Sequence, residues 1–279
     1  MMMLSKSSFA LISLSMAFSV AFGGSAGLTN PANPGAAERA IAQNELPTDW
    51  NVFETPEGAP GRRIGGGTRG NCPKSASGMI ALVPENNLGL TLSNTPTFLF
   101  YVPKIDEASS GPIEMEFLLV DESDPENVQE IYQQRVPLPT GGGTIALTLP
   151  DDENLPPLQV NQLYSWYFSL ICNPKALDPS ILSLGGWIER VEPSPTLTQE
   201  LEPLTSRDRI AVYERELLWF DAIGTLAQLL QDNPNDPFLR PKWNALLESI
   251  NLSEVAQAPF LNWEQEQTSN RDRPSLQKP

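Results

Sequence analysis

The 279-residue sequence contains no histidine, which limits the chemistry that its side chains can perform. Imidazole is the usual general base near neutral pH and a frequent metal ligand. Ser-His-Asp triads, Cys-His pairs and histidine-containing zinc sites are therefore excluded. Two cysteines are also too few for a zinc site made of thiolates alone. Any catalysis would have to depend on carboxylates, lysine, tyrosine or serine.

Glu114 and Glu116 are the best pair of carboxylates for acid–base catalysis. They stand two residues apart in an alternating segment, so both would project from one face of a strand, with Cα atoms about 6.5–7 Å apart. This spacing is compatible with an inverting glycosidase. However, Ile113, Met115 and Phe117 occupy the alternate positions, and acidic residues commonly solvate the outer face of a half-buried sheet. We therefore predict no catalytic residue.

A glycine run flanked by arginines is a candidate anion site. Residues 62–74 contain four basic residues and no acidic one, and backbone N–H groups of such a run can form an anion-binding nest. It is not a phosphate-binding P-loop, because no Gly-Lys-Ser/Thr follows. The alternative is a glycine turn through which the chain enters the fold, with arginines at its rim. The candidate residues are Arg63, Gly65, Gly66, Gly67 and Arg69.

Two acidic clusters, residues 121–126 and 151–153, resemble loops that supply oxygen ligands to calcium. Neither has the spacing of an EF-hand loop, so we interpret both as solvated hairpin turns and predict no metal and no cofactor. Trp166, Tyr167, Phe168 and Trp187 suggest a sugar-binding platform. Strand alternation places Trp166 and Phe168 together on one face, where core packing explains them, and leaves Tyr167 or Trp187 as an exposed binding surface.

The elements that would position these residues are mostly strands. Short apolar runs separated by turn residues recur from Gly78 onward, which is typical of a sandwich or barrel. The predicted strands are residues 88–92, 96–102, 113–120, 128–136, 144–149, 162–172 and 186–191. Leu158 lies six residues before Tyr164, as in the tyrosine corner of immunoglobulin-like domains. We predict a mainly β fold, an antiparallel immunoglobulin- or fibronectin-like β-sandwich over residues 61–195.

After Pro195 the apolar period changes to that of a helix. One stripe runs from Tyr213 to Leu230, a proline-containing turn follows at residues 233–237, and a second stripe runs from Trp243 to Ile250. We predict a C-terminal helical hairpin over residues 196–262 and a polar tail over residues 263–279. A lone hairpin cannot bury its apolar face, so it must dock on the sandwich or on a partner. A protein partner is therefore expected.

The N-terminus has the features of a secretory signal. Lys6 precedes an apolar stretch from Phe9 to Phe22, and small residues follow it. We predict a signal peptide over residues 1–26, a flexible linker over residues 27–60, and no stable membrane insertion after cleavage. The protein would then be periplasmic or extracellular. Because such compartments are oxidising and only one pairing exists, Cys72 and Cys172 are predicted to form a disulfide.

Several motifs together resemble one known family. They are residues 62–73 (Arg-Arg-Ile-Gly-Gly-Gly-Thr-Arg-Gly-Asn-Cys-Pro), 81–84, 96–103, 164–174, 186–191 and 218–222 (Leu-Trp-Phe-Asp-Ala). The set is similar to a cyanobacterial domain-of-unknown-function family, number nine-two-eight, over about residues 60–260. The resemblance implies an exported protein of undetermined activity. It assigns no catalytic or binding residue.

The formal charge of −16 disfavours nucleic acid as a partner, because affinity for phosphates requires a basic face. We therefore expect an exported protein of unknown activity that serves as a non-catalytic binding or scaffold module. The alternative is a carboxylate-based hydrolase of glycans or peptides that uses Glu114 and Glu116.

Overall fold

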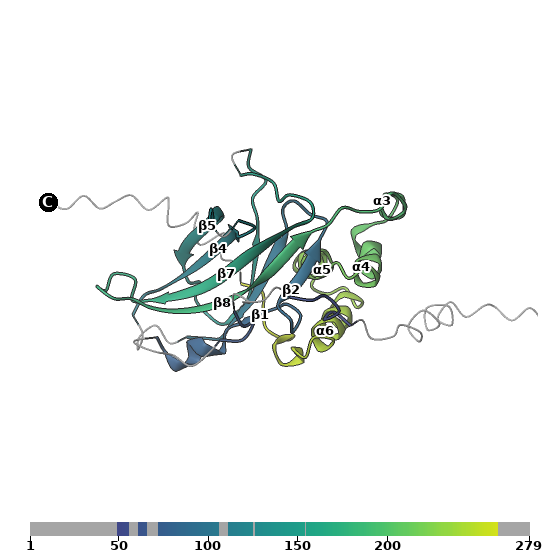
Figure 1. Ribbon diagram of the computed structural model, residues 1–279. Helices are drawn as coiled ribbons and strands as arrows, with labels where there is room; N and C mark the ends of the chain where they lie inside the picture. The colour runs from purple at the N-terminus through teal and green to yellow at the C-terminus, as the bar shows by residue number, and fades with distance from the viewer. Residues whose placement is uncertain are drawn as a thin grey trace, which may run out of the picture. The chain divides into compact units, whose positions relative to one another are not determined.

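The computed structural model of the chain describes residues 49–55, 61–65, 72–105, 111–124, 126–153 and 155–261 (Figure 1). The predicted signal peptide, most of the predicted linker and the polar tail lie outside these residues. Among the described residues, no helix combines the length and the apolar character needed to cross a membrane.

Eight strands and four α-helices make up the described fold, which is mostly β with helices at its C-terminal end. The strands are β1 (Ile80–Ala81), β2 (Leu88–Thr91), β3 (Thr97–Val102), β4 (Ile113–Asp121), β5 (Gln129–Pro137), β6 (Gly143–Thr148), β7 (Gln162–Cys172) and β8 (Ser180–Arg190). The helices are α3 (Pro195–Leu201), α4 (Ser206–Arg215), α5 (Trp219–Asp232) and α6 (Leu239–Glu248), with 3₁₀ turns η1 (Lys74–Gly78) and η2 (Ser253–Val255).

The strands form two sheets, one of order β1-β3-β6 and one of order β2-β8-β7-β4-β5. All pairs are antiparallel except β2 and β8, whose parallel register places Leu88 opposite Trp187. The prediction of a wholly antiparallel sandwich was wrong at this edge. Parallel neighbours require a long connection, and nearly ninety residues of intervening chain separate β2 from β8.

Aromatic side chains from the two sheets meet in the core. The rings of Phe100 on β3 and Phe168 on β7 stack with centroids 4.1 Å apart, and Phe98 lies 4.7 Å from Phe117 on β4. Trp166 is fully buried beside them. The alternation read from β4 and β7 is therefore confirmed, because every second side chain points to the opposite sheet.

The tyrosine-corner hydrogen bond predicted for Tyr164 is confirmed. Its phenolic oxygen accepts a hydrogen bond of 2.8 Å from the backbone N–H of Gln159, and Leu158 is buried beneath the corner. Asn161 between them has a φ of 59°, a left-handed conformation that asparagine tolerates better than most residues. These contacts hold the chain where it enters β7.

The predicted helical hairpin is four helices, so that prediction was too simple. The apolar stripe from Tyr213 to Leu230, which predicted one helix, belongs to two helices, because α4 ends and α5 begins within it. The N–H of Leu218 donates to the carbonyl of Tyr213, and the N–H of Leu217 donates to that of Glu214. With Leu217 at a φ of 59°, this is a Schellman cap, which a leucine rarely occupies.

Helix α5 docks on the sandwich in the same chain (Figure 1). Phe220 lies 5.0 Å from Phe98, and Trp219 donates from Nε1 to the carbonyl of Leu82. A Cβ on Gly89 would lie 2.7 Å from the Phe220 ring, so a glycine at this position of β2 is what permits the close approach. The apolar face of α5 is thus covered by the sandwich.

Residues at both ends of the described fold pack onto it. Trp50 is buried, contacts the Trp219 ring edge-on at 4.8 Å and donates to Ser249. Trp50, within the segment predicted as a linker, therefore packs onto the described fold. At the other end, residues 259–261 pair with Thr144 on the free edge of β6.

Candidate functional site

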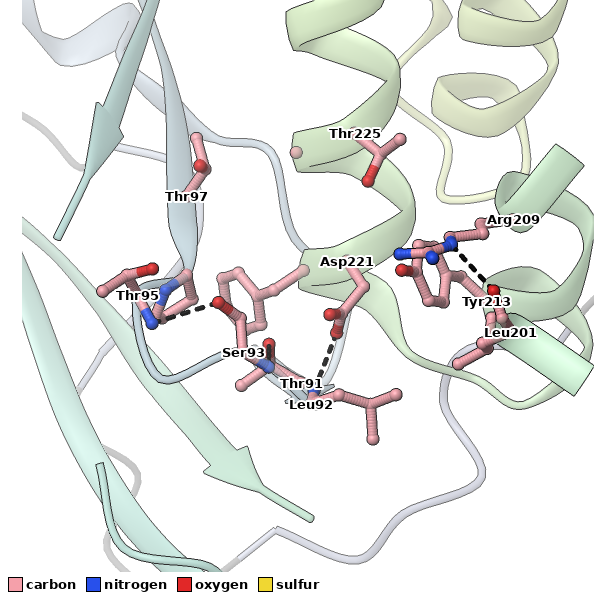
Figure 2. A pocket seen from close by; sticks show the side chains of 13 residues that line it. Thr91, Leu92, Ser93, Thr95, Thr97, Leu201, Arg209, Tyr213, Asp221 and Thr225 are labelled. Atoms are coloured by element: carbon pink, nitrogen blue, oxygen red, sulfur yellow. Dashed lines mark hydrogen bonds between the residues drawn. The ribbon is translucent and has the colours of Figure 1, made fainter. Parts of the chain in front are cut away.

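A pocket of about 430 Å³ lies between the β2–β3 connection and helices α3, α4 and α5 (Figure 2). One wall is the segment from Thr91 to Thr97, and the other is formed by residues of the three helices. The pocket exists because α5 docks next to β2 and β3, with the segment between these strands on one side and residues of α3 and α4 on the other. Its polar groups come from parts of the chain more than a hundred residues apart.

Asp221 is the carboxylate of the pocket. It lies in the first turn of α5, and its Oδ2 accepts a hydrogen bond of 2.9 Å from the backbone N–H of Leu92. Burial raises the pKa of Asp221 to about 6, while hydrogen bonds from Leu92 and from the Thr91 side chain oppose the rise. The carboxyl therefore ties the end of β2 to α5 and titrates close to neutral pH.

We expect the free energy of unfolding of the wild type to fall as the pH rises from about 4 to about 6. The pKa of Asp221 is higher in the folded protein than in the unfolded chain, so the folded state binds more protons in this range. A rise from 3.8 to about 6 corresponds to about 3 kcal/mol, as an order of magnitude. Asp221→Asn lacks this titration, so urea denaturation should show a smaller fall. Identical pH profiles for the two proteins would contradict this assignment.

Arg209 and Tyr213 stand one turn apart on α4 and face the pocket (Figure 2). The Nε of Arg209 donates to the carbonyls of Leu201 and Leu204, at 3.1 and 3.2 Å, which fixes the guanidinium against the end of α3. Burial raises the pKa of Tyr213, the Asp221 charge adds to the rise, and a hydrogen bond with Arg209 opposes it. The phenol therefore stays protonated at neutral pH.

Hydroxyl groups stand on both walls of the pocket. Ser93 Oγ accepts from the N–H of Thr95, and the hydroxyls of Thr97 and Thr148 lie 2.8 Å apart. Among the described residues, the hydroxyls of Thr95 and Thr225 have no hydrogen-bond partner. Both belong to the pocket lining, so they are available to a ligand.

Glu114 and Glu116 lie outside this pocket, on the half-exposed face of β4. Arg135 of the neighbouring strand β5 donates from Nε to Glu114 at 2.6 Å and has its Nη1 4.0 Å from Glu116. Gln133 also donates to Glu116. Both carboxylates therefore have cross-strand partners of the kind that stabilise the solvated face of a sheet.

Arg63 of the candidate anion site has a structural role. Its side chain is 10% exposed, and Nη1 donates to the carbonyls of Val83 and Ile250, at 3.0 and 2.8 Å. Nη2 lies 3.4 Å from Glu85. The N–H of Gly65 donates to Met79. The other candidate residues, Gly66, Gly67 and Arg69, lie outside the described residues, so anion binding by them stays a prediction.

We expect Arg63→Met to lower the free energy of unfolding by about 2–3 kcal/mol. The change leaves two carbonyls without their charged donor, one on the sandwich and one at the end of α6, and such bonds contribute about 1.5–3 kcal/mol each at most. The matched control is Glu85→Gln, which removes the charge that pairs with Arg63 but keeps an amide oxygen that can accept from Asn251, and it should change stability by less than about 1 kcal/mol. Chemical denaturation of both variants tests this, and a larger loss in the control would contradict it.

The structure joins Cys72 and Cys172 in a disulfide, with Cα atoms 5.3 Å apart. Cys72 precedes η1, and Cys172 is the last residue of β7. Both are buried, so the bond lies in the core and not on the surface. It ties the N-terminal segment of the sandwich to the longer sheet.

The acidic turns and the aromatic cluster serve the fold. Asp121 and Asp124 accept backbone hydrogen bonds from residues two positions later, which closes their turns. Within the described residues, no group of acidic or cysteine side chains is arranged to hold a metal ion. Trp187 is buried, and the hydroxyl of the half-buried Tyr167 donates to Glu122. No sugar platform forms at these positions.

The residues of the pocket were not predicted from the sequence. Asp221 did have a signal, since it is the only charged residue in the first three turns of the apolar helix α5 and belongs to the Leu-Trp-Phe-Asp-Ala motif. Arg209 and Thr225 had none. They become candidates only when α4 and α5 are seen to lie against the β2–β3 connection.

The fold and the site thus define a two-sheet β protein with a docked helical unit and a polar pocket between them. The chain belongs to the family Domain of Unknown Function (DUF928), whose profile matches residues 64–260. No curated protein matches the sequence. Among solved structures, the chain is similar to one described as pT26-6p, with 15% sequence identity and a TM-score of 0.24. That match covers 61% of this chain and spans 37% of the length of the other.

Proposed function

We propose that this protein is an exported, non-catalytic binding module whose ligand site is the pocket between the sandwich and the helices. The observation that carries the proposal is the single carboxylate of the pocket. Glycan hydrolysis of the usual kind requires two carboxyl groups across the scissile bond, and Asp221 has no acidic neighbour in the lining. A polar pocket with one carboxylate, one guanidinium and several hydroxyls suits recognition better than bond cleavage.

Export is supported by the N-terminal sequence and by the cysteines. The basic and apolar residues before Phe22 have the pattern of a secretory signal. The disulfide between Cys72 and Cys172 fits an oxidising compartment such as the periplasm or the exterior.

An immunoglobulin-like sandwich is part of the proposal. In such domains the B and E strands are neighbours in one sheet, while C and F are neighbours in the other, with G beyond F. Here β3 and β6 are neighbours in one sheet, and β4, β7 and β8 follow one another in the other. The tyrosine corner lies at the start of β7, and in immunoglobulin-like domains it lies near the start of the F strand.

A protein partner is also proposed, at the turn between β7 and β8. Leu177 in this turn is fully exposed, and Ile181 is 56% exposed at the start of β8. Large apolar side chains gathered at one exposed turn favour contact with another protein. The helical unit no longer requires a partner, because its apolar face is covered within the chain.

The proposal is tested by assaying the mature protein for hydrolysis of peptidoglycan, soluble glycans and casein, with products followed by mass spectrometry. We expect no product at any pH from about 4 to about 8, the range in which carboxyl-based catalysts work. Turnover that is lost in Glu114→Gln, or in Asp221→Asn, would overturn the proposal in favour of a hydrolase. The control variant is Arg207→Gln. Arg207 does not line the pocket and pairs with Asp236, not with Glu114 or Asp221.

A further inference from the structure

The free hydrogen-bonding groups of the pocket stand on opposite walls. Thr95 lies on the β2–β3 connection and Thr225 on α5, and among the described residues neither hydroxyl has a protein partner. A hydroxyl can both donate and accept, so each threonine can pair with a ligand hydroxyl in either direction. A carboxylate can only accept and an ammonium can only donate, so either group would use only one half of this capacity.

The two charged groups of the pocket oppose each other in sign. Asp221 lies on the α5 side, where its carboxylate already accepts from the N–H of Leu92, from the Thr91 side chain and from its own backbone N–H, so about one of its roughly four acceptor sites is left for a ligand. Arg209 is held by its Nε, so its terminal amino groups are directed toward Tyr213 and the pocket (Figure 2). A ligand of net charge meets one attractive and one repulsive group. A neutral ligand that both donates and accepts forms charge-assisted hydrogen bonds with both, donating to Asp221 and accepting from Arg209.

Apolar groups complete the lining. Leu92, Pro96, Phe220 and the ring of Tyr213 lie among the polar groups. A ring that has hydroxyls at its edge and C–H groups on its faces matches such an alternation of polar and apolar contacts. The volume of about 430 Å³ lies within the usual range for sites that bind small molecules.

We infer that this pocket binds a neutral, hydroxyl-rich small molecule of the size of a mono- or disaccharide. Thr95 and Thr225 bond to ligand hydroxyls from opposite walls, Asp221 accepts from the ligand, and Arg209 donates to it. The inference rests on the proposed function only in taking the pocket as the ligand site. It adds the chemical class of the ligand and the residues that select it.

The test is isothermal titration of the full mature protein with three sets of compounds. The neutral set is glucose, galactose, sucrose and trehalose, the charged set is glucuronate and glucosamine, and the zwitterionic set is alanine and glycine betaine. We expect one or more neutral sugars to bind more tightly than every charged or zwitterionic compound. Tighter binding of a charged or zwitterionic compound would overturn the inference, as would the absence of binding by all neutral sugars.

Side-chain variants locate the binding. Thr225→Val and Thr95→Val remove one hydroxyl each without changing the size of the side chain, so each should weaken sugar binding about three- to tenfold. The matched control is Thr140→Val, at an exposed position outside the pocket, which should leave affinity unchanged. Thermal unfolding of each variant establishes that it is folded. Sugar binding that is equal in all three variants would show a site elsewhere and overturn the inference.

Failure of this inference and failure of the proposed function are distinguishable. If a neutral sugar binds in a Thr225-dependent manner and a glycosidic bond is then cleaved, the ligand class stands and the non-catalytic function falls. If no neutral sugar binds and no hydrolysis occurs, the ligand class falls and the non-catalytic function stands.

Discussion

Reduction of the disulfide between Cys72 and Cys172 is expected to lower the free energy of unfolding by as much as about 4.7 kcal/mol. This is the chain-entropy value for a closed loop of about 100 residues, and the two cysteines are separated by 100 positions. Since a domain of this size loses about 2–4 °C per kcal/mol, the melting temperature should fall by as much as about 10–20 °C. Calorimetry with and without a reductant measures the effect.

The control for this result is the double variant Cys72→Ala/Cys172→Ala. It should have the lower melting temperature of the reduced wild type and should not respond to the reductant. Two thiols titrated in the reduced sample would establish that the bond was broken. An unchanged melting temperature after that titration would contradict the stabilising role assigned to the bond.

Phe220→Ala is expected to destabilise the protein by about 3–5 kcal/mol, the usual cost of deleting a buried phenylalanine ring. Phe220 fills the contact between α5 and the sandwich, where it meets Phe98 and the bare backbone of Gly89. The loss therefore acts on the joint between the helical unit and the sheet. Urea denaturation, followed by tryptophan fluorescence because Trp219 is the adjacent residue, measures it.

The matched control is Phe238→Ala, at the residue that precedes α6. Phe238 is 38% exposed and lies beneath the Arg207 guanidinium at 4.2 Å, a contact that contributes about 0.5–1 kcal/mol at a surface. Its removal should cost about 1 kcal/mol or less. Equal losses in the two variants would show that the helices are not held to the sandwich through Phe220.

The local periodicity of the sequence was sufficient to predict most of the elements. β4 has a bulge after Leu119, and β7 is largely buried on both faces. From Ile113 to Leu119, however, the side chains alternate between the core and the outer face, and this pattern is visible without knowledge of any neighbour. The spacing of Leu158 and Tyr164 predicted the hydrogen bond to Gln159 for the same reason, because all the groups involved lie within seven residues.

Longer-range and backbone-dependent features were not predicted. The stripe from Tyr213 to Leu230 keeps its helical period across the junction of α4 and α5, so periodicity alone could not show that Leu217 adopts a left-handed conformation there. The two-residue strand β1 is too short to have a pattern. Arg63 looked available to an anion because the carbonyls it binds belong to residues 20 and 187 positions away.

The sequence by itself determined the β-rich class, the helical C-terminal part, the family and the exclusion of histidine chemistry, because these depend on composition, local period and motif order. Only the tertiary structure decided that β2 pairs with β8 in parallel, that α5 covers the sandwich, and that Thr95, Arg209 and Asp221 line one pocket. The physical reason is that such contacts depend on how helices and sheets pack, which joins residues about a hundred or more positions apart.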